Sequence, residues 1–145
     1  MTIALASDHR GYELKSNIIL KLQSKYELID LGTTSNESTD YPLYAFKLGE
    51  FIRDKKADFG IAICGTGIGI SIACNKVKGT RCAKISNVND AYYAHLHNNA
   101  NIIAFGEDTS IELAIEMIET YINTPFSDEE KHHRRVEEID NYKWD

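Results

Sequence analysis

The feature that most constrains the fold is the stretch at 61–76, which reads IAICGTGIGISIACNK. An apolar run ends at Cys64, and three alternating glycines follow at once, at positions 65, 67 and 69. A second apolar, helix-compatible segment comes next. This order predicts a buried strand, a tight turn and a helix whose first backbone N–H groups face a bound anion. The thiol at the entrance of the turn is the unusual part of the pattern.

Short apolar runs alternate with helix-compatible segments along the whole chain. The predicted strands are residues 3–6, 26–31, 59–64, 81–86 and 101–105. The predicted helices are residues 9–22, 42–55, 70–77, 87–97, 109–122 and 128–140. Such alternation is typical of βαβ units. We therefore predict a Rossmann-like, three-layer α/β/α sandwich with a five-stranded, mostly parallel sheet.

Individual residues indicate where two of the predicted helices begin and which side of the second one faces the core. Ser7 and Asp8 offer side-chain oxygens as N-caps for the first helix, and Pro42 suits the first turn of the second. The apolar spacing of the second helix predicts a core-facing set made of Leu43, Phe46, Leu48 and Ile52.

Composition narrows the class of protein. The 145 residues are expected to form one domain, 1–145. A net charge of −6 disfavours nucleic acid or an anionic membrane as partner. The first residues lack the basic start of a signal peptide, and no apolar run approaches the ~18 residues of a membrane span. Three cysteines without disulfide-framework spacing predict free thiols in a cytoplasmic protein.

The predicted topology suggests where a site would form. Ligands of parallel sheets bind beyond the carboxyl ends of the strands. The first strand leads to Asp8 and His9, the third to Cys64 and the glycine turn, and the fourth strand and its helix to His97 and Asn98. We expect these three groups to converge on one edge of the sheet.

The spacing of the glycines excludes three common phosphate-binding motifs. The pattern G-x-G-x-G follows the third strand, whereas a dinucleotide fingerprint needs G-x-G-x-x-G after the first. No Gly-Lys-Ser/Thr follows, and the place of the arginine of a cysteine phosphatase is taken by Ile70. Two interpretations stay open: an anion-binding turn, or a tight turn that packs a helix closely on the sheet.

Cys64 likewise has two interpretations. Turn amides and a helix N-terminus stabilise a thiolate placed beside them, which suits a functional thiol. A free cysteine is more often a small buried apolar side chain, the role expected for Cys74 and Cys82. The place of Cys64 at the end of its strand favours a functional thiol.

The histidines and the final helix carry weaker signals. His95 and His97 lie two residues apart on a helix and point in different directions, so we expect no metal site. Lys131 and Arg135 are four residues apart and share a helix face. That face could bind a phosphate. The alternative is an ordinary solvated surface, because the final helix also contains pairs of opposite charges.

Several motifs together resemble one family over nearly the whole chain. They are Asp8-His9 after the first strand, TDYP at 39–42, CGTGIGISIACNK at 64–76, HNN at 97–99 and HHRRVE at 132–137. The chain resembles the ribose-5-phosphate isomerase type B family, which also includes the galactose-6-phosphate isomerase subunits. The TDYP motif favours the ribose enzymes.

The resemblance implies a cofactor-free interconversion of ribose 5-phosphate and ribulose 5-phosphate through an enediolate. It implies that Cys64 is the base, because Ile70 stands where one branch of the family has a glutamate. It makes His97 the acid that opens the sugar ring, with Thr66 assisting. The residues implied to bind substrate are Asp8, His9, Gly65, Thr66, Gly67, Ile68, Gly69, Asn98, Lys131 and Arg135.

Three positions depart from the family pattern. Lys131 is preceded by two glutamates where the family commonly has Gly-Gly-Arg, and lysine cannot form the bidentate fork of arginine. Asp108 stands where an arginine is common, and Asn99 where an aspartate is common. These departures affect the expected phosphate site and substrate range.

The resemblance also implies an assembly. Family members are homodimers or dimers of dimers whose active sites lie across the subunit interface. We expect the final helix to extend to a partner subunit through apolar side chains at Val136, Ile139, Tyr142 and Trp144. Alternative functions are an allose or galactose 6-phosphate isomerase, a non-catalytic phosphosugar-binding module and, more distantly, a redox thiol protein.

Overall fold

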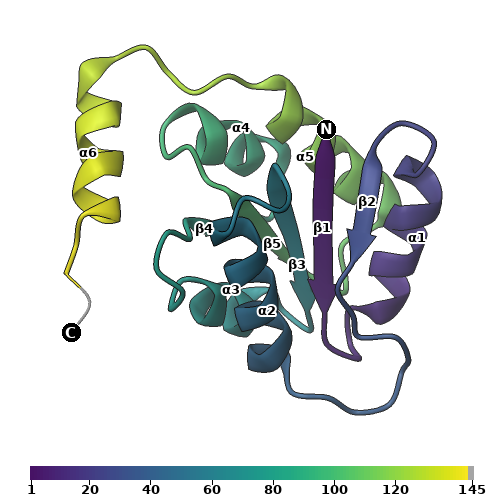
Figure 1. Ribbon diagram of the computed structural model, residues 1–145. Helices are drawn as coiled ribbons and strands as arrows, with labels where there is room; N and C mark the ends of the chain where they lie inside the picture. The colour runs from purple at the N-terminus through teal and green to yellow at the C-terminus, as the bar shows by residue number, and fades with distance from the viewer. Residues whose placement is uncertain (144–145) are drawn as a thin grey trace.

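Five parallel strands in the order β2-β1-β3-β5-β4 form the central sheet of the computed structural model, which describes residues 1–143 (Figure 1). The strands are β1 Thr2–Ser7, β2 Glu27–Asp30, β3 Phe59–Cys64, β4 Cys82–Lys84 and β5 Ile102–Gly106. The helices are α1 Tyr12–Leu22, α2 Tyr41–Arg53, α3 Ile68–Cys74, α4 Val88–Leu96, α5 Ile111–Asn123 and α6 Glu130–Asp140. All four strand pairings are parallel.

Two apolar cores lie on the two faces of the sheet. On one face, α1, α4 and α5 pack against the side chains of Ile3, Leu5, Ile61 and Ile63. On the other face, α2 and α3 pack against Ala4, Ala6 and Ala62. Alternate residues of each central strand serve opposite cores, as the period of two requires. The predicted three-layer α/β/α sandwich is confirmed (Figure 1).

The register of the central strands aligns their carboxyl ends. Ser7 of β1 pairs with Ile63 of β3, and Cys64 pairs with Gly106 of β5. The residues that follow each strand therefore emerge at the same edge of the sheet. This edge brings together Asp8, the turn after Cys64 and the segment after Gly106.

The first helix begins later than its sequence predicts. Residues 9–11 form a turn, because both the Arg10 and Gly11 N–H groups donate to the Asp8 carboxylate. The N-cap of α1 is Gly11, without a side-chain cap. The expected capping role of Ser7 is wrong, since its buried hydroxyl has no hydrogen-bond partner among residues 1–143.

The core-facing stripe of α2 differs from the prediction in two positions. Pro42 does lie in the first turn, and Leu48 and Ile52 are buried as expected. Leu43 and Phe46 are instead exposed, by 65% and 38%. Small residues are buried instead: Ala45 packs in the core on this face of the sheet, and Gly49 lies against Val77, which follows α3. Two large apolar side chains of α2 are thus left on the surface.

The remaining boundaries shift by a few residues. Helix α3 begins at Ile68 rather than at residue 70, directly after Gly67, which adopts a left-handed conformation with φ of +81°. Strand β4 is only three residues long, whereas residues 81–86 were predicted. The final helix begins at Glu130 rather than at residue 128.

Helix α6 lies at the side of the α/β/α sandwich and is not one of the helices that cover the sheet. An extended segment, residues 124–129, leads to it from α5, and the helix lies beyond the β4 edge of the sheet (Figure 1). His132 and Val136 are buried against the body, while Ile139 and Tyr142 are 50% and 74% exposed. Trp144, the fourth predicted apolar anchor, lies outside the described residues. Nothing in the structure tests the expected contact with a partner subunit.

Across residues 1–143, no helix combines the length and the apolar character that crossing a lipid bilayer requires.

Candidate active site

A cavity of about 840 Å³ opens at the carboxyl-terminal edge of the sheet, where β1 and β3 end. Its walls come from the segment after β1, the end of the 33–40 loop, the start of α2 and the turn after β3. The lining includes the predicted site residues Asp8, His9, Cys64, Gly65, Thr66, Ile68 and Gly69. The structure therefore brings together seven of the residues expected to act on a substrate.

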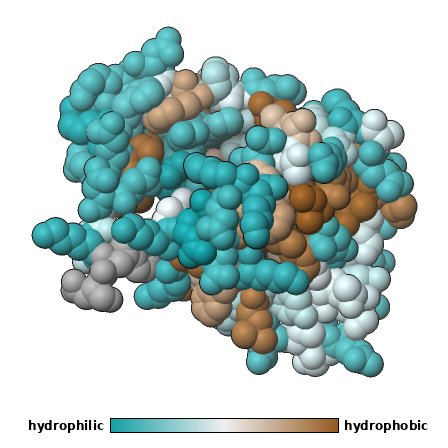
Figure 2. Space-filling view, viewed as in Figure 1, coloured by the Kyte–Doolittle hydropathy of each residue, from teal (hydrophilic) through white to brown (hydrophobic). Residues whose placement is uncertain are grey.

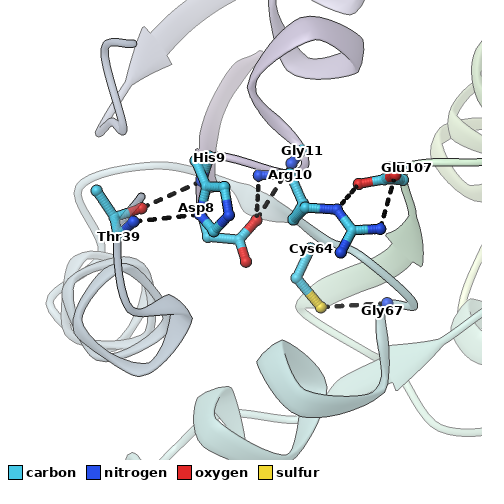
Figure 3. A network of polar contacts seen from close by, with 8 residues as sticks. All are labelled: Asp8, His9, Arg10, Gly11, Thr39, Cys64, Gly67 and Glu107. Atoms are coloured by element: carbon cyan, nitrogen blue, oxygen red, sulfur yellow. Dashed lines mark hydrogen bonds and ion pairs between the residues drawn. The ribbon is translucent and has the colours of Figure 1, made fainter. Parts of the chain in front are cut away.

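Cys64 lines this cavity and is only 4% exposed. Its Sγ accepts a hydrogen bond of 3.2 Å from the backbone N–H of Gly67 (Figure 3). A side chain at position 67 would place its Cβ 2.7 Å from the carbonyl carbon of Phe105. Only glycine fits this close approach and the positive φ, so the turn holds its amide against the thiol.

The rest of the turn is equally constrained. The Thr66 hydroxyl accepts a hydrogen bond of 3.1 Å from the N–H of Ile68. A Cβ at Gly69 would lie 2.6 Å from the ring of Tyr41, at the start of α2. The turn is thus both an amide-rich wall of a cavity and a tight packing element, so the two interpretations of its glycines are compatible.

Asp8 and His9 are fixed by different partners. Oδ1 of Asp8 accepts the N–H groups of Arg10 and Gly11, so this oxygen organises the turn before α1. His9 exchanges two hydrogen bonds with Thr39: its N–H donates to Oγ1, and its Nδ1 accepts the Thr39 N–H, each at 3.1 Å (Figure 3). Because Nδ1 accepts, neutral His9 carries its proton on Nε2. The imidazole can therefore donate from that nitrogen.

Arg10 is a lining residue that the sequence analysis missed. Its Nε and Nη2 donate to the two carboxylate oxygens of Glu107, at 2.6 and 2.9 Å (Figure 3). Glu107 follows β5, so the pair spans two strand ends. The carboxylate raises the pKa of Arg10, and the guanidinium lowers the pKa of Glu107. The position of Arg10 directly after Asp8-His9 was the available signal, as was TDYP for Thr39.

His97 and Asn98 do not join this cavity, so the expected convergence of three groups on one edge is wrong. They follow α4, and a helix between parallel strands ends where the next strand begins. The carbonyl of Asn101 accepts the N–H of Gly60, which places this segment beside the start of β3. With six residues in β3, the two edges lie roughly 20 Å apart at ~3.3 Å per residue.

A second group of predicted site residues gathers near that opposite edge. Asn98 and Arg135 line a cavity of about 760 Å³ between α6 and the body. His97 stacks on His132 of α6, with ring centroids 4.2 Å apart. Burial and the neighbouring His97 lower the pKa of His132. Lys131 lies near Glu129, with Nζ 3.4 Å from a carboxylate oxygen. The predicted site is thus divided into two halves.

Arg81 links the two segments that carry this second group of residues. Its Nε and Nη2 both donate to the carbonyl of Asn99, at 3.1 and 3.0 Å. Its Nη1 donates to Asp140, at the end of α6, at 2.7 Å. One side chain therefore ties α6 to the segment that carries His97 and Asn98.

The other two cysteines do not line the cavity that contains Cys64, although half-buried Cys82 lies beside Asn98 near the second group. Cys74 is fully buried and its thiol faces the carbonyl of Ala45, so its expected core role is confirmed. Contact with Cys74 and burial raise the pKa of Cys82. Within residues 1–143, no group of three or more His, Cys, Asp or Glu side chains is arranged to hold a metal ion.

Comparisons with known proteins agree with this architecture. The model of the Ribose/Galactose Isomerase family matches residues 3–139. Ribose-5-phosphate isomerase B of Escherichia coli is 40% identical over 139 residues, which cover 94% of this chain and 93% of that protein.

Two solved structures are closely similar. The ribose-5-phosphate isomerase B of Clostridium thermocellum has a TM-score of 0.93 and 43% identity, over 97% of this chain and 95% of that one. Its counterpart from Thermotoga maritima has a TM-score of 0.92 and 44% identity, over 97% and 98%. Both the matched family model and these identities lead to one assignment: this chain belongs to the ribose/galactose isomerase family.

Proposed function

We propose that this protein is an aldose–ketose isomerase that interconverts D-ribose 5-phosphate and D-ribulose 5-phosphate without a cofactor. The observation that carries the proposal is the buried Cys64 thiol, held by the Gly67 N–H in the lining of a cavity large enough for a pentose phosphate. The names of the relatives from three organisms support the same substrate. A reducing cytoplasm, which keeps such a thiol free, is the proposed location.

Cys64 is the proposed base. In the open-chain aldose, its thiolate removes the proton on C2. The electron pair of that C–H bond forms the C1–C2 double bond while the π pair of the C1 carbonyl moves to O1, which gives the enediolate. The thiol then returns the proton to C1 while a proton passes from O2 to O1, which leaves the carbonyl at C2. A single base that serves both carbons must face one side of the bound sugar, and Cys64 is proposed to do so from the lining of the cavity.

Backbone amides are the proposed oxyanion site. The enediolate needs preorganised donors where its negative charge develops. Within the turn from Gly65 to Gly69, the N–H groups of Gly67 and Ile68 already donate to Cys64 and Thr66. The proposed donors are therefore the N–H groups of the other residues of the turn that line the cavity, Gly65, Thr66 and Gly69. Asp8 and His9 line the same cavity. The Nε2–H of His9 is a further donor for a sugar or phosphate oxygen.

The second half of the proposed site comes from another copy of the chain. Ring opening needs an acid, and the phosphate needs cations. The residues proposed for these roles, His97, Asn98, Lys131 and Arg135, lie on the other side of the sheet from Cys64. One molecule of substrate cannot span this separation, so a homodimer, or a dimer of dimers, must bring the two halves of different subunits together.

The surface around the cavity supports this assembly. Leu43 and Phe46 of α2 and Ile68 and Ile72 of α3 are exposed by 38–65%. Apolar side chains reach the surface over these two helices in the space-filling view (Figure 2). Contiguous exposed apolar side chains of this kind mark protein–protein contacts. The apolar Ile139 and Tyr142 on and after α6 are the proposed counterpart.

Proton exchange tests the reaction. Incubated in deuterated water with ribose 5-phosphate, the wild-type protein should introduce deuterium at C2 and form ribulose 5-phosphate. Cys64→Ala should lose exchange by about 10²–10⁴-fold, the usual share of a general base. Exchange at the wild-type rate in Cys64→Ala would disprove the assigned base. A wild type that binds phosphosugars but neither exchanges nor converts any of them is a binding module.

A substrate panel and a mass measurement complete the test. Ribose 5-phosphate should be converted with a higher kcat/KM than allose 6-phosphate or galactose 6-phosphate, and the reverse order would make the protein a hexose phosphate isomerase. Light scattering should give a dimer or tetramer; a fully active monomer would rule out the shared site.

A further inference from the structure

We propose that Arg10, oriented by Glu107, binds the phosphate of the substrate from the side of the site that carries Cys64. This inference rests on the proposed function and adds to it a residue that is not among the site residues implied by the family resemblance.

The charge of the residues that line the cavity favours a cation on this side of the site. Asp8 and Asp40 both line the cavity, and the whole chain carries a net charge of −6. A phosphate dianion entering the cavity therefore meets a repulsive field. Among the residues that line the cavity, Arg10 is the one with a permanent positive charge. Lys131 and Arg135 belong to the other half of the site and do not change the balance within this chain.

The guanidinium lies at the solvent-accessible wall of the cavity. Its Cζ would lie 3.6 Å from a Cβ built on Gly65, and Nη1 would lie 3.7 Å from it. Arg10 therefore covers the first residue of the turn that follows Cys64. In Figure 3 the guanidinium group lies between the Glu107 carboxylate and the Cys64–Gly67 turn.

The pairing with Glu107 leaves one edge of the guanidinium free. Nε and Nη2 donate to Glu107. Nη1 has no hydrogen-bond partner within residues 1–143, and Nη2 retains a second N–H. Arginine presents five N–H donors in a rigid fork, so the Nη1–Nη2 edge can still bind two phosphate oxygens. The two hydrogen bonds to Glu107 fix the plane of the Arg10 guanidinium and therefore the direction in which its Nη1–Nη2 edge points.

The ion pair between Arg10 and Glu107 is expected to contribute little to the stability of the fold. The Arg10 side chain is 57% exposed, and exposed ion pairs contribute little to folding. Arg53 and Asp54 form a similar exposed pair at the end of α2, away from the cavity, with Nε and Nη2 again donating to one carboxylate. Arg53 is therefore a matched control: it has the same ion-pair geometry without a place at the cavity.

The experiment compares Arg10→Ala with Arg53→Ala. Steady-state kinetics should show that Arg10→Ala raises KM for ribose 5-phosphate about tenfold or more, as expected for a lost charge-assisted hydrogen bond. Arg53→Ala should keep the wild-type KM. Glu107→Gln should raise KM less than Arg10→Ala, because the cation remains but is held less firmly. A KM in Arg10→Ala equal to that of Arg53→Ala would overturn the proposal.

A binding measurement separates this proposal from the proposed function. Calorimetric titration with ribose 5-phosphate, with ribose and with inorganic phosphate needs no turnover. Arg10→Ala should weaken the two phosphate-containing ligands by the same factor, whereas an equal loss for ribose would overturn the phosphate assignment. A wild type that binds ribose 5-phosphate through Arg10 but converts no sugar would refute the isomerase and leave this binding role intact.

Discussion

The N–H of Gly67 donates to Sγ of Cys64 across a single turn, at 3.2 Å. The donor is available only because Gly67 adopts a φ of +81° against the backbone of Phe105. The position of the Cys64 thiol therefore depends on the backbone conformation of the turn. Changes to the turn should affect the fold and the site together.

Gly67→Ala should destabilise the protein by about 2 kcal/mol or more, because a Cβ is strained at this φ and meets the Phe105 backbone at 2.7 Å. Gly65→Ala is the control for stability, since its nearest contact beyond the adjacent residues is the Arg10 side chain at 3.6 Å. Urea denaturation measures both. Equal loss in the two variants would show that the turn tolerates a side chain at position 67.

Lys15 and Asp30 should respond unequally to mutation. Lys15 is fully buried and donates to Asp30 at 2.6 Å and to the carbonyl of Thr33 at 2.9 Å, whereas Asp30 is 41% exposed. Asp30→Ala leaves a buried ammonium without its counter-ion and should cost about 2–3 kcal/mol. Lys15→Met keeps the apolar volume and should cost only about 1 kcal/mol. The opposite order in urea denaturation would contradict this account.

His132 should make stability depend on pH. Its pKa is lowered in the folded protein by burial and by His97. The unfolded chain therefore binds a proton more readily once the pH falls below about 6.5, the ordinary histidine value. The stabilising contribution of neutral His132 is complete above that pH and is lost as the pH falls through the lower, folded pKa.

The measurement is the free energy of unfolding at pH 8.0 and pH 5.5. The drop between the two should be smaller in His132→Phe, which keeps an aromatic ring on His97, than in the wild type. His133→Phe is the control, because His133 is exposed and bonds the carbonyl of Ser127. An unchanged drop in His132→Phe would show that another group titrates.

Arg81 should fix α6 more firmly than Asp140 does. Asp140→Ala removes one partly exposed ion pair, worth about 0.5–1 kcal/mol. Arg81→Ala also removes both donors to the Asn99 carbonyl and should cost about 1–2 kcal/mol. Hydrogen exchange of the α6 amides should accelerate in both variants, more in Arg81→Ala. Unchanged exchange would mean that the His97–His132 stack alone holds the helix.

The elements of the fold were predictable where burial on both faces leaves a continuous apolar run. Strand β3 was predicted residue for residue, because all of Phe59–Cys64 is buried. The face of α2 was not, since Leu43 and Phe46 fit a helical apolar stripe but are exposed. The helical spacing of apolar residues does not distinguish a side chain that packs in the core from one that is exposed on the surface.

The candidate site was predictable only in part. Asp8 and Cys64 follow strands, so the parallel topology alone brings them together. His97 ends a helix that leads into the next parallel strand, so the predicted topology already placed it at the amino-terminal end of the sheet, and the expected convergence overlooked this direction. The partner of Arg10 is Glu107, 97 residues away, and no local pattern reports such a pairing.

A site divided between the two edges of one sheet has a genetic consequence. Under the proposed mechanism, an assembly made only of Cys64→Ala subunits, or only of His97→Ala subunits, has no working site. In the proposed homodimer, a mixed pair recovers one intact site, made of Cys64 from one subunit and His97 from the other. Random assembly of equal amounts should thus restore roughly a quarter of all sites. Two inactive alleles of this gene would complement each other in one cell.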